Sequence, residues 1–244
     1  MASAATFELH VLTASGRLGP HLGAIEEQIA AAFDKAGAKL ELSGEAVDVV
    51  VRDAAAITIP EIGIGGVAPD AHTIFISLDP THPRFDHTIG NGLARTIAHE
   101  VHHVARRRAG RRGNTLWAAF VHEGLADRFC AELYGGEPPL WSFAPGATLD
   151  ALTALAIAER DSESYDHGIW FFGKDQATVP RWAGYAMGWR VVGAYLERHP
   201  GAQPSRLVDV PADAFDVPQL TCAPTKARPR VCRVSPSCDK PNLA

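Results

Sequence analysis

The alternation of apolar and polar residues over residues 7–78 predicts a small sheet with one helix. Four short segments predict strands, namely residues 7–13, 47–51, 57–67 and 72–78. Between the first two strands, Leu22, Ile25 and Ile29 recur at helical spacing and predict an amphipathic helix over residues 18–36. The order strand, helix, strand, strand, strand suits a mixed sheet with helices on one side.

The third of these strands contains residues that weaken a strand, namely Pro60, Gly63, Gly65 and Gly66. Two interpretations stay open for this segment. It is either a flexible hairpin, or an edge strand that pairs with an extended peptide through backbone hydrogen bonds.

The pattern becomes helical from residue 89 onward. Leu93, Ile97 and Val101 recur at helical spacing and predict a helix. Asp86 is the expected N-cap of this helix, and Gly110 is the expected stop.

A second helix is expected to begin after the N-cap Asn114 and to end at Tyr134, because two glycines follow. Two later helices are expected over residues 149–160 and 180–198, and residues 161–175 between them are expected to form a polar loop.

The sequence His99-Glu100-Val101-His102-His103 fits the pattern H-E-x-x-H and falls inside the first predicted helix. Residues four apart lie on one face of a helix, so His99 and His103 can bind one zinc ion together. Glu100 is then placed to take a proton from a water that the ion activates. His102 points roughly 100° away from His103 and is expected to take no part. The competing interpretation is a pair of surface histidines on an amphipathic helix.

Glu123 follows His103 by 20 residues and can supply a third ligand. It lies mid-helix among apolar neighbours, where a carboxylate is costly unless it has a partner such as a metal ion. Asp127 follows one turn later and can orient a histidine that binds the metal. His122 is the alternative third ligand, since imidazole and carboxylate both suit zinc.

These residues resemble the gluzincin (thermolysin-like) clan of metallopeptidases, in which a Glu-x-x-x-Asp sequence follows the zinc helix, as Glu123 and Asp127 do here. Residues 98–105, 121–129 and 180–192 also resemble a bacterial family of predicted zinc-dependent proteases of otherwise unknown function. The resemblance implies a zincin-like fold and peptidase chemistry.

We therefore expect an α+β, zincin-like fold: a small mixed sheet with an N-terminal helix, then the zinc-binding helix, then a helical C-terminal lobe. The expected ligands of Zn²⁺ are His99, His103 and Glu123, and Glu100 is the expected general base. A non-catalytic zinc-containing binding or regulatory module stays open as an alternative. A zinc amidohydrolase that acts on a small molecule is the third interpretation.

Peptide hydrolysis also needs a donor that stabilises the oxyanion. Tyr185 is the first candidate, and His167 in the predicted polar loop is the second. Tyr185 lies between Gly184 and Gly188, which are expected to allow close packing against a neighbouring helix. The alternative for Tyr185 is a core residue whose hydroxyl binds a backbone carbonyl.

Composition excludes several other classes of protein. The chain has 244 residues, 46% of them hydrophobic, and a net charge of −5, which gives no bias towards nucleic acids or membranes. No apolar run approaches the roughly 18 residues of a membrane span, and residues 1–5 lack the features of a secretory signal. Four cysteines are too few for a disulfide scaffold, so a cytoplasmic location is expected. The expected partner is a peptide or protein substrate, and nothing predicts the oligomeric state.

Two further segments have unusual composition. Residues 221–244 are rich in proline and basic residues, so we expect a disordered tail after a domain over residues 1–220. Five arginines surround the end of the zinc helix: Arg106, Arg107, Arg108, Arg111 and Arg112. The helix dipole and solvent account for such a cluster, with an anionic partner as the alternative.

Overall fold

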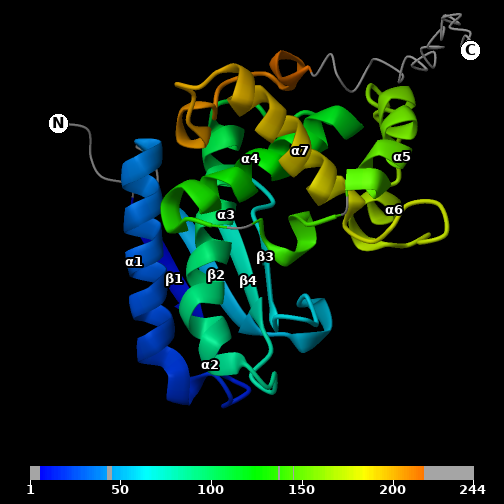
Figure 1. The fold of residues 1–244 in the computed structure, drawn as a ribbon. Helices are drawn as coiled ribbons and strands as arrows, with labels where there is room; N and C mark the ends of the chain where they lie inside the picture. Colours follow the sequence, from blue (N-terminus) through cyan, green and yellow to red (C-terminus); the bar gives the residue numbers. More distant parts are fainter. Residues whose placement is uncertain (1–5, 43–45, 137, 145, 217–244) are drawn as a thin grey trace, which may run out of the picture.

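The computed structural model describes residues 6–42, 46–136, 138–144 and 146–216, which form a sheet and a group of helices (Figure 1). The strand order in the sheet is β1-β2-β4-β3. The strands are β1 (Phe7–Val11), β2 (Val47–Asp53), β3 (Ile64–Val67) and β4 (Thr73–Leu78). β1, β2 and β4 are parallel, and β3 is antiparallel to β4 at one edge. This mixed sheet confirms the predicted α+β class.

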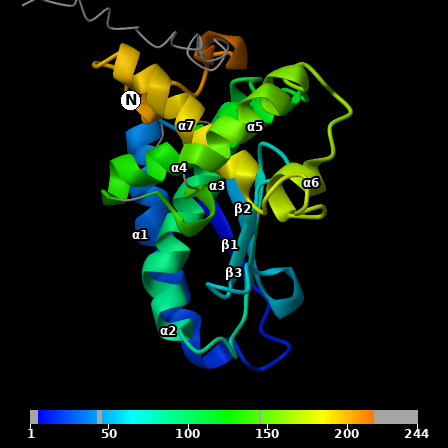
Figure 2. The same ribbon diagram turned by 45° about the vertical axis from the view of Figure 1, so that its right-hand side comes forward.

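Helices make up most of the remaining described residues. They are α1 (Leu22–Leu40), α2 (Phe85–His87), α3 (Leu93–Arg108), α4 (Leu116–Tyr134), α5 (Gly146–Ala158), α6 (His167–Phe172) and α7 (Ala183–Arg198). A π turn, η3 (Thr88–Gly92), joins α2 to α3, and the 3-10 turns are η1 (Gly19–His21), η2 (Ala55–Ile57), η4 (Leu140–Ser142), η5 (Pro204–Arg206) and η6 (Ala212–Phe215). α1 and α3 cover one face of the sheet, and α4, α5 and α7 gather beyond one end of it (Figures 1 and 2).

The first helix and the H-E-x-x-H helix both differ from prediction at their N-termini. α1 begins at Leu22 and not at residue 18, because η1 precedes it, and it continues to Leu40. The expectation that Asp86 caps the metal helix is wrong, since Asp86 lies within α2. The helical path already starts at Phe85, and in its π turn the Thr88 hydroxyl donates to the carbonyl of Ile62 (2.7 Å).

The N-cap of α4 lies one residue later than predicted. The Oγ1 atom of Thr115, and not the side chain of Asn114, accepts the backbone N–H of Ala118 (3.2 Å). The helix ends at Tyr134 as predicted, and Gly135 follows with φ 71°.

The later helices also shift, and the predicted loop is partly helical. α5 spans Gly146–Ala158 in place of residues 149–160, and α7 starts at Ala183 in place of residue 180. The prediction that residues 161–175 form only a loop is wrong, because α6 lies within them. The side chain of Asp166 caps α6 by accepting the N–H of Ile169 (3.2 Å).

The strand predicted over residues 57–67 is much shorter, and only β3 remains of it. Gly63 has φ 67°, so the chain reverses there and Ile59 pairs with Ile64. β3 nevertheless lies at the edge of the sheet, as one of the two interpretations of this segment requires.

The described residues form two hydrophobic cores, and α4 contributes to both. The first joins the sheet to α1 and α3 and includes Ile29 and Val49. The second joins α4 to α7 and includes Phe120, Trp170 and Met187. Residues 221–244, predicted to be a tail, lie outside the described residues. None of the helices in the described ranges has the length and apolar character needed to cross a membrane.

Candidate metal centre

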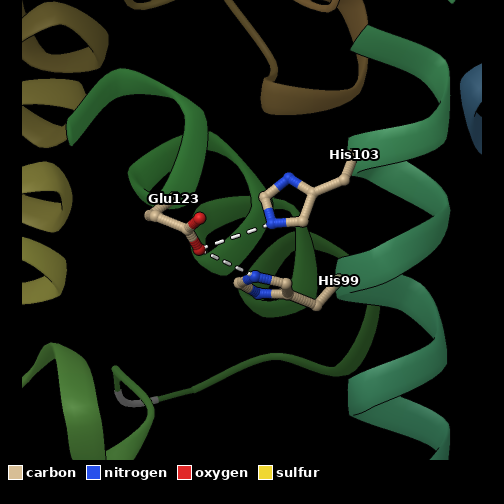
Figure 3. A group of neighbouring side chains, drawn as sticks. All are labelled: His99, His103 and Glu123. Atoms are coloured by element: carbon tan, nitrogen blue, oxygen red, sulfur yellow. Dashed lines mark hydrogen bonds and ion pairs between the residues drawn. The ribbon is translucent and has the colours of Figure 1, made fainter. Parts of the chain in front are cut away.

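The three predicted ligands lie together where α3 faces α4 (Figure 3). His99 and His103 project from successive turns of α3, and Glu123 projects from α4. The Oε2 atom of Glu123 lies 3.1 Å from Nε2 of His99 and 3.4 Å from Nε2 of His103. One ligand atom from each residue lies within 4.8 Å of the other two. The two histidines one turn apart on α3 and the mid-helix carboxylate on α4 are thus directed towards one common position.

The chemistry of this group suits zinc. Two imidazole nitrogens and one carboxylate oxygen match a three-ligand catalytic zinc site, which leaves a further position for water or substrate. His99 and His103 are buried, and both direct Nε2 towards the carboxylate. Burial alone would raise the pKa of Glu123, but the adjacent imidazoles outweigh it and hold this pKa well below its usual range. The side chain of Glu123 is therefore ionised and negatively charged.

Asp127 supports His99 from the side away from Glu123. Its Oδ1 atom lies 2.9 Å from Nδ1 of His99 and accepts the indole N–H of Trp141 (3.2 Å). Its Oδ2 atom accepts the hydroxyl of Ser142. Asp127 is only 1% exposed, so it fixes the ring of His99 from within the protein.

Glu100 lies beside the ligands at the wall of a cavity of about 900 Å³, which His99, His103 and Glu123 also line. Burial raises the pKa of its carboxyl group, although the nearby imidazoles oppose this shift. Gly66 on β3 makes room for this carboxylate, because an added Cβ atom would lie 2.6 Å from Oε1 of Glu100. From the sequence alone, Gly66 is expected only to weaken a strand.

Tyr185 and His167 line the same cavity, from α7 and α6. The ring of Tyr185 packs edge-on against Phe171, with centroids 5.0 Å apart, and burial raises its pKa well above the usual value. Its hydroxyl therefore keeps its proton. The ring of His167 stacks on Phe171 at 4.3 Å, and its Nδ1 atom lies 3.2 Å from the hydroxyl of Tyr165. The structure thus brings both candidate donors to the cavity.

The two remaining histidines of the motif region have different surroundings. The ring of His122 stacks on His103 at 3.9 Å and lines the cavity, but the group of three ligand atoms contains Glu123 and not His122. His102 turns away and packs against Phe129, with centroids 5.3 Å apart. Burial lowers the pKa of both imidazoles well below the usual value.

A family model described as "Predicted Zn-dependent protease (DUF2268)" matches residues 25–216. This match spans well over half of the chain, which therefore belongs to that family. No curated protein and no solved structure matches the chain. The family's metal agrees with the His-His-Glu group, which could hold such an ion.

Proposed function

We propose that the protein is a zinc-dependent peptidase. The observation that carries this proposal is the convergence of His99, His103 and Glu123 at a cavity that Glu100 also lines. Membership in a family described as predicted zinc-dependent proteases supports it. In this proposal Asp127 holds the ring of His99 in the orientation that binding requires.

A zinc ion bound to these three ligands would supply Lewis-acid chemistry, which activates a water molecule and polarises a carbonyl. Glu100 acts as the general base in this proposal. Its carboxylate accepts the proton of the attacking water and then passes it to the leaving amine. The raised pKa of Glu100 supports this role, because a stronger base takes up a proton more readily.

The hydroxyl of Tyr185 stabilises the oxyanion in this proposal, with His167 as the second candidate. Tyr185 lines the cavity together with Glu100 and Glu123, and burial keeps its hydroxyl protonated. A protonated hydroxyl at the cavity wall is a suitable donor for the charge that develops on the carbonyl oxygen.

We propose that an extended peptide lies along β3. Gly66 and Val67 line the cavity, and in the described part of the chain no other strand covers the outer edge of β3 beyond the bridge between Ile59 and Ile64. An edge strand offers backbone N–H and C=O groups that a peptide can pair with irrespective of its side chains.

A cytoplasmic location stays a prediction.

The test compares wild-type protein with Glu100→Gln, which removes the base and keeps the ligands. Zinc content is measured by elemental analysis, and cleavage is measured on a broad peptide library. The proposal expects one zinc per chain in both proteins and loss of most turnover in the variant. Glu26→Gln is the matched control, because Glu26 is exposed on α1, away from the cavity.

Three outcomes contradict the proposal. Equal turnover in wild type and Glu100→Gln excludes Glu100 as the base. Stoichiometric zinc with no cleavage of any peptide favours a binding or regulatory module. Hydrolysis of small amides with peptides left intact favours an amidohydrolase.

A further inference from the structure

The five arginines near the end of α3 divide into two groups. Three donate to backbone carbonyls: Arg106 to Leu207, Val208 and Val210, Arg108 to Ala71, and Arg111 to Asp209. The other two, Arg107 and Arg112, line the cavity of the candidate metal centre. The helix dipole alone does not explain this division.

Arg107 lies on the same face of α3 as the histidines. It follows His103 by four residues, as His103 follows His99, so all three side chains project to one side of the helix. Arg112 reaches the cavity from the turn between α3 and α4. The two guanidinium groups therefore lie at the end of the cavity where α3 turns into α4.

Neither guanidinium has a protein partner among the residues that the structure describes. No carboxylate there lies within ion-pair distance of Arg107 or Arg112, and Nε of Arg107 is buried without a hydrogen-bond partner. Burial lowers the pKa of Arg107, and the charge of Arg112 lowers it further. A partly buried cation without a partner is unfavourable, so an anion from outside the protein would stabilise it.

The acidic residues of the same cavity do not serve as that anion. Glu100 and Glu123 attract Arg107 only from beyond ion-pair distance, and Glu123 contacts both imidazoles. Glu163 also lines the cavity, but it is exposed and makes no ion pair within the described ranges. A bound divalent ion would make the formal charge of the whole lining positive.

We propose that Arg107 and Arg112 bind a carboxylate of the peptide substrate, which is either its C-terminal carboxylate or an aspartate or glutamate side chain. This subsite rests on the proposed peptidase function. The planar guanidinium matches a carboxylate through two parallel hydrogen bonds. Four residues of helix rise about 6 Å, and an extended peptide advances about 3.3 Å per residue. The bound carboxylate therefore belongs to a residue about two positions from the cleaved bond.

The experiment uses zinc-loaded protein and four fluorogenic peptides with one core sequence. Two peptides differ only in a free or amidated C-terminus, and two differ only in Glu or Gln two positions from the cleaved bond. The variants are Arg107→Gln, Arg107→Lys and Arg112→Gln, with Arg111→Gln as the matched control outside the cavity lining. Lysine keeps the charge of Arg107 but loses the paired hydrogen bonds, and melting temperatures verify that each variant folds.

We expect Arg107→Gln to lower kcat/KM on the preferred carboxylate peptide by about tenfold to a hundredfold, the range for a lost hydrogen bond to a charged group. The neutral peptides should change little, Arg107→Lys should fall between, and the Arg111→Gln control should match wild type. A preference for the free over the amidated C-terminus identifies the carboxylate as the C-terminal one. A preference for Glu over Gln identifies it as a side chain. An equal loss on all four peptides, or no loss on any, overturns the subsite.

A binding measurement separates this proposal from the peptidase function itself. Fluorescence polarisation measures the affinity of the same peptides for Glu100→Gln, alone and combined with Arg107→Gln. One outcome is that the wild type cleaves no peptide, while Glu100→Gln binds the carboxylate peptide more tightly than its neutral counterpart and loses this preference when Arg107→Gln is added. That outcome supports the subsite and refutes the peptidase function. Cleavage by wild type without any carboxylate preference supports the peptidase and refutes the subsite.

Discussion

Substitution of Asp127 tests how far the metal centre depends on the residues behind it. Its carboxylate contacts three groups, namely Nδ1 of His99 at 2.9 Å, the indole N–H of Trp141 at 3.2 Å, and the hydroxyl of Ser142. Asp127→Ala removes all three contacts at a site that is 1% exposed. Asp127→Asn keeps the shape and one acceptor oxygen, and the Ser142 hydroxyl can rotate to accept from the new amide.

The structure sets different magnitudes for the two variants. Loss of the support of a ligand weakens zinc binding by about tenfold to a hundredfold, with Asn near the lower and Ala near the upper value. In Asp127→Ala, the buried hydroxyl of Ser142 and the partly buried indole N–H of Trp141 lose their acceptor, at about 1–3 kcal/mol each. The free energy of unfolding of the metal-free protein should therefore fall by about 2–6 kcal/mol. At roughly 2–4 °C per kcal/mol, its melting temperature falls by about 4–24 °C.

The assay combines two measurements on each variant. Competition with a chromophoric chelator gives the Kd for zinc, and calorimetry of the metal-free protein gives the melting temperature. Glu132→Ala is the matched control on the same helix, because Glu132 accepts the N–H (2.9 Å) and the hydroxyl (2.8 Å) of Ser205, away from the cavity. We expect this control to lose stability and keep its zinc affinity. Wild-type zinc affinity in Asp127→Ala, or an equal loss of affinity in Glu132→Ala, would refute the reasoning.

Three further predictions concern the cavity itself. His103→Ala should lose stoichiometric zinc, because two remaining ligands hold the ion weakly, and one zinc per chain by elemental analysis would contradict the ligand assignment. Tyr185→Phe should lower kcat by about a hundredfold to a thousandfold with KM, zinc content and melting temperature nearly unchanged, whereas an undiminished kcat would remove Tyr185 from the reaction. Gly66→Ala should displace the carboxylate of Glu100 and lower kcat by about a hundredfold with zinc retained, because the added Cβ would lie 2.6 Å from Oε1. Gly23→Ala is its control, since an added Cβ there meets no atom within 4 Å, and equal kcat values in these two glycine variants would falsify the assigned role of Gly66.

The metal group could be predicted from the sequence because each of its parts follows helix periodicity. His99 and His103 are one turn apart on α3, and Glu123 and Asp127 are one turn apart on α4. Such spacings hold wherever the helix lies, provided that the helix forms. The exact ends of both helices mattered little, so the misplaced caps at Asp86 and Asn114 left the predicted group intact.

Contacts between distant elements could not be predicted in this way. Trp141 and Ser142 reach Asp127 from a 3-10 turn 14 and 15 residues later in the chain, and no periodic pattern relates the two segments. The prediction of one strand over residues 57–67 failed for another reason. Gly63 adopts φ 67° and reverses the chain, a local choice that the apolar pattern around it does not encode.

The placement of Tyr185 depends on a close backbone approach between α4 and α7. The two helices cross where Gly124 faces Gly188, and a Cβ atom added to either glycine would overlap a main-chain carbonyl of the other helix. Helix axes approach most closely where the side chains at the contact are smallest. Glu123 precedes Gly124 directly and Tyr185 lies one turn before Gly188, so this crossing brings the tyrosine to the cavity that the carboxylate lines. The histidines depend instead on α3 and on the first core. A bulkier residue at Gly188 would press on both helices of this crossing, so it should displace Tyr185 and the neighbouring Glu123 together, and both turnover and zinc affinity should fall while the two histidines keep their places.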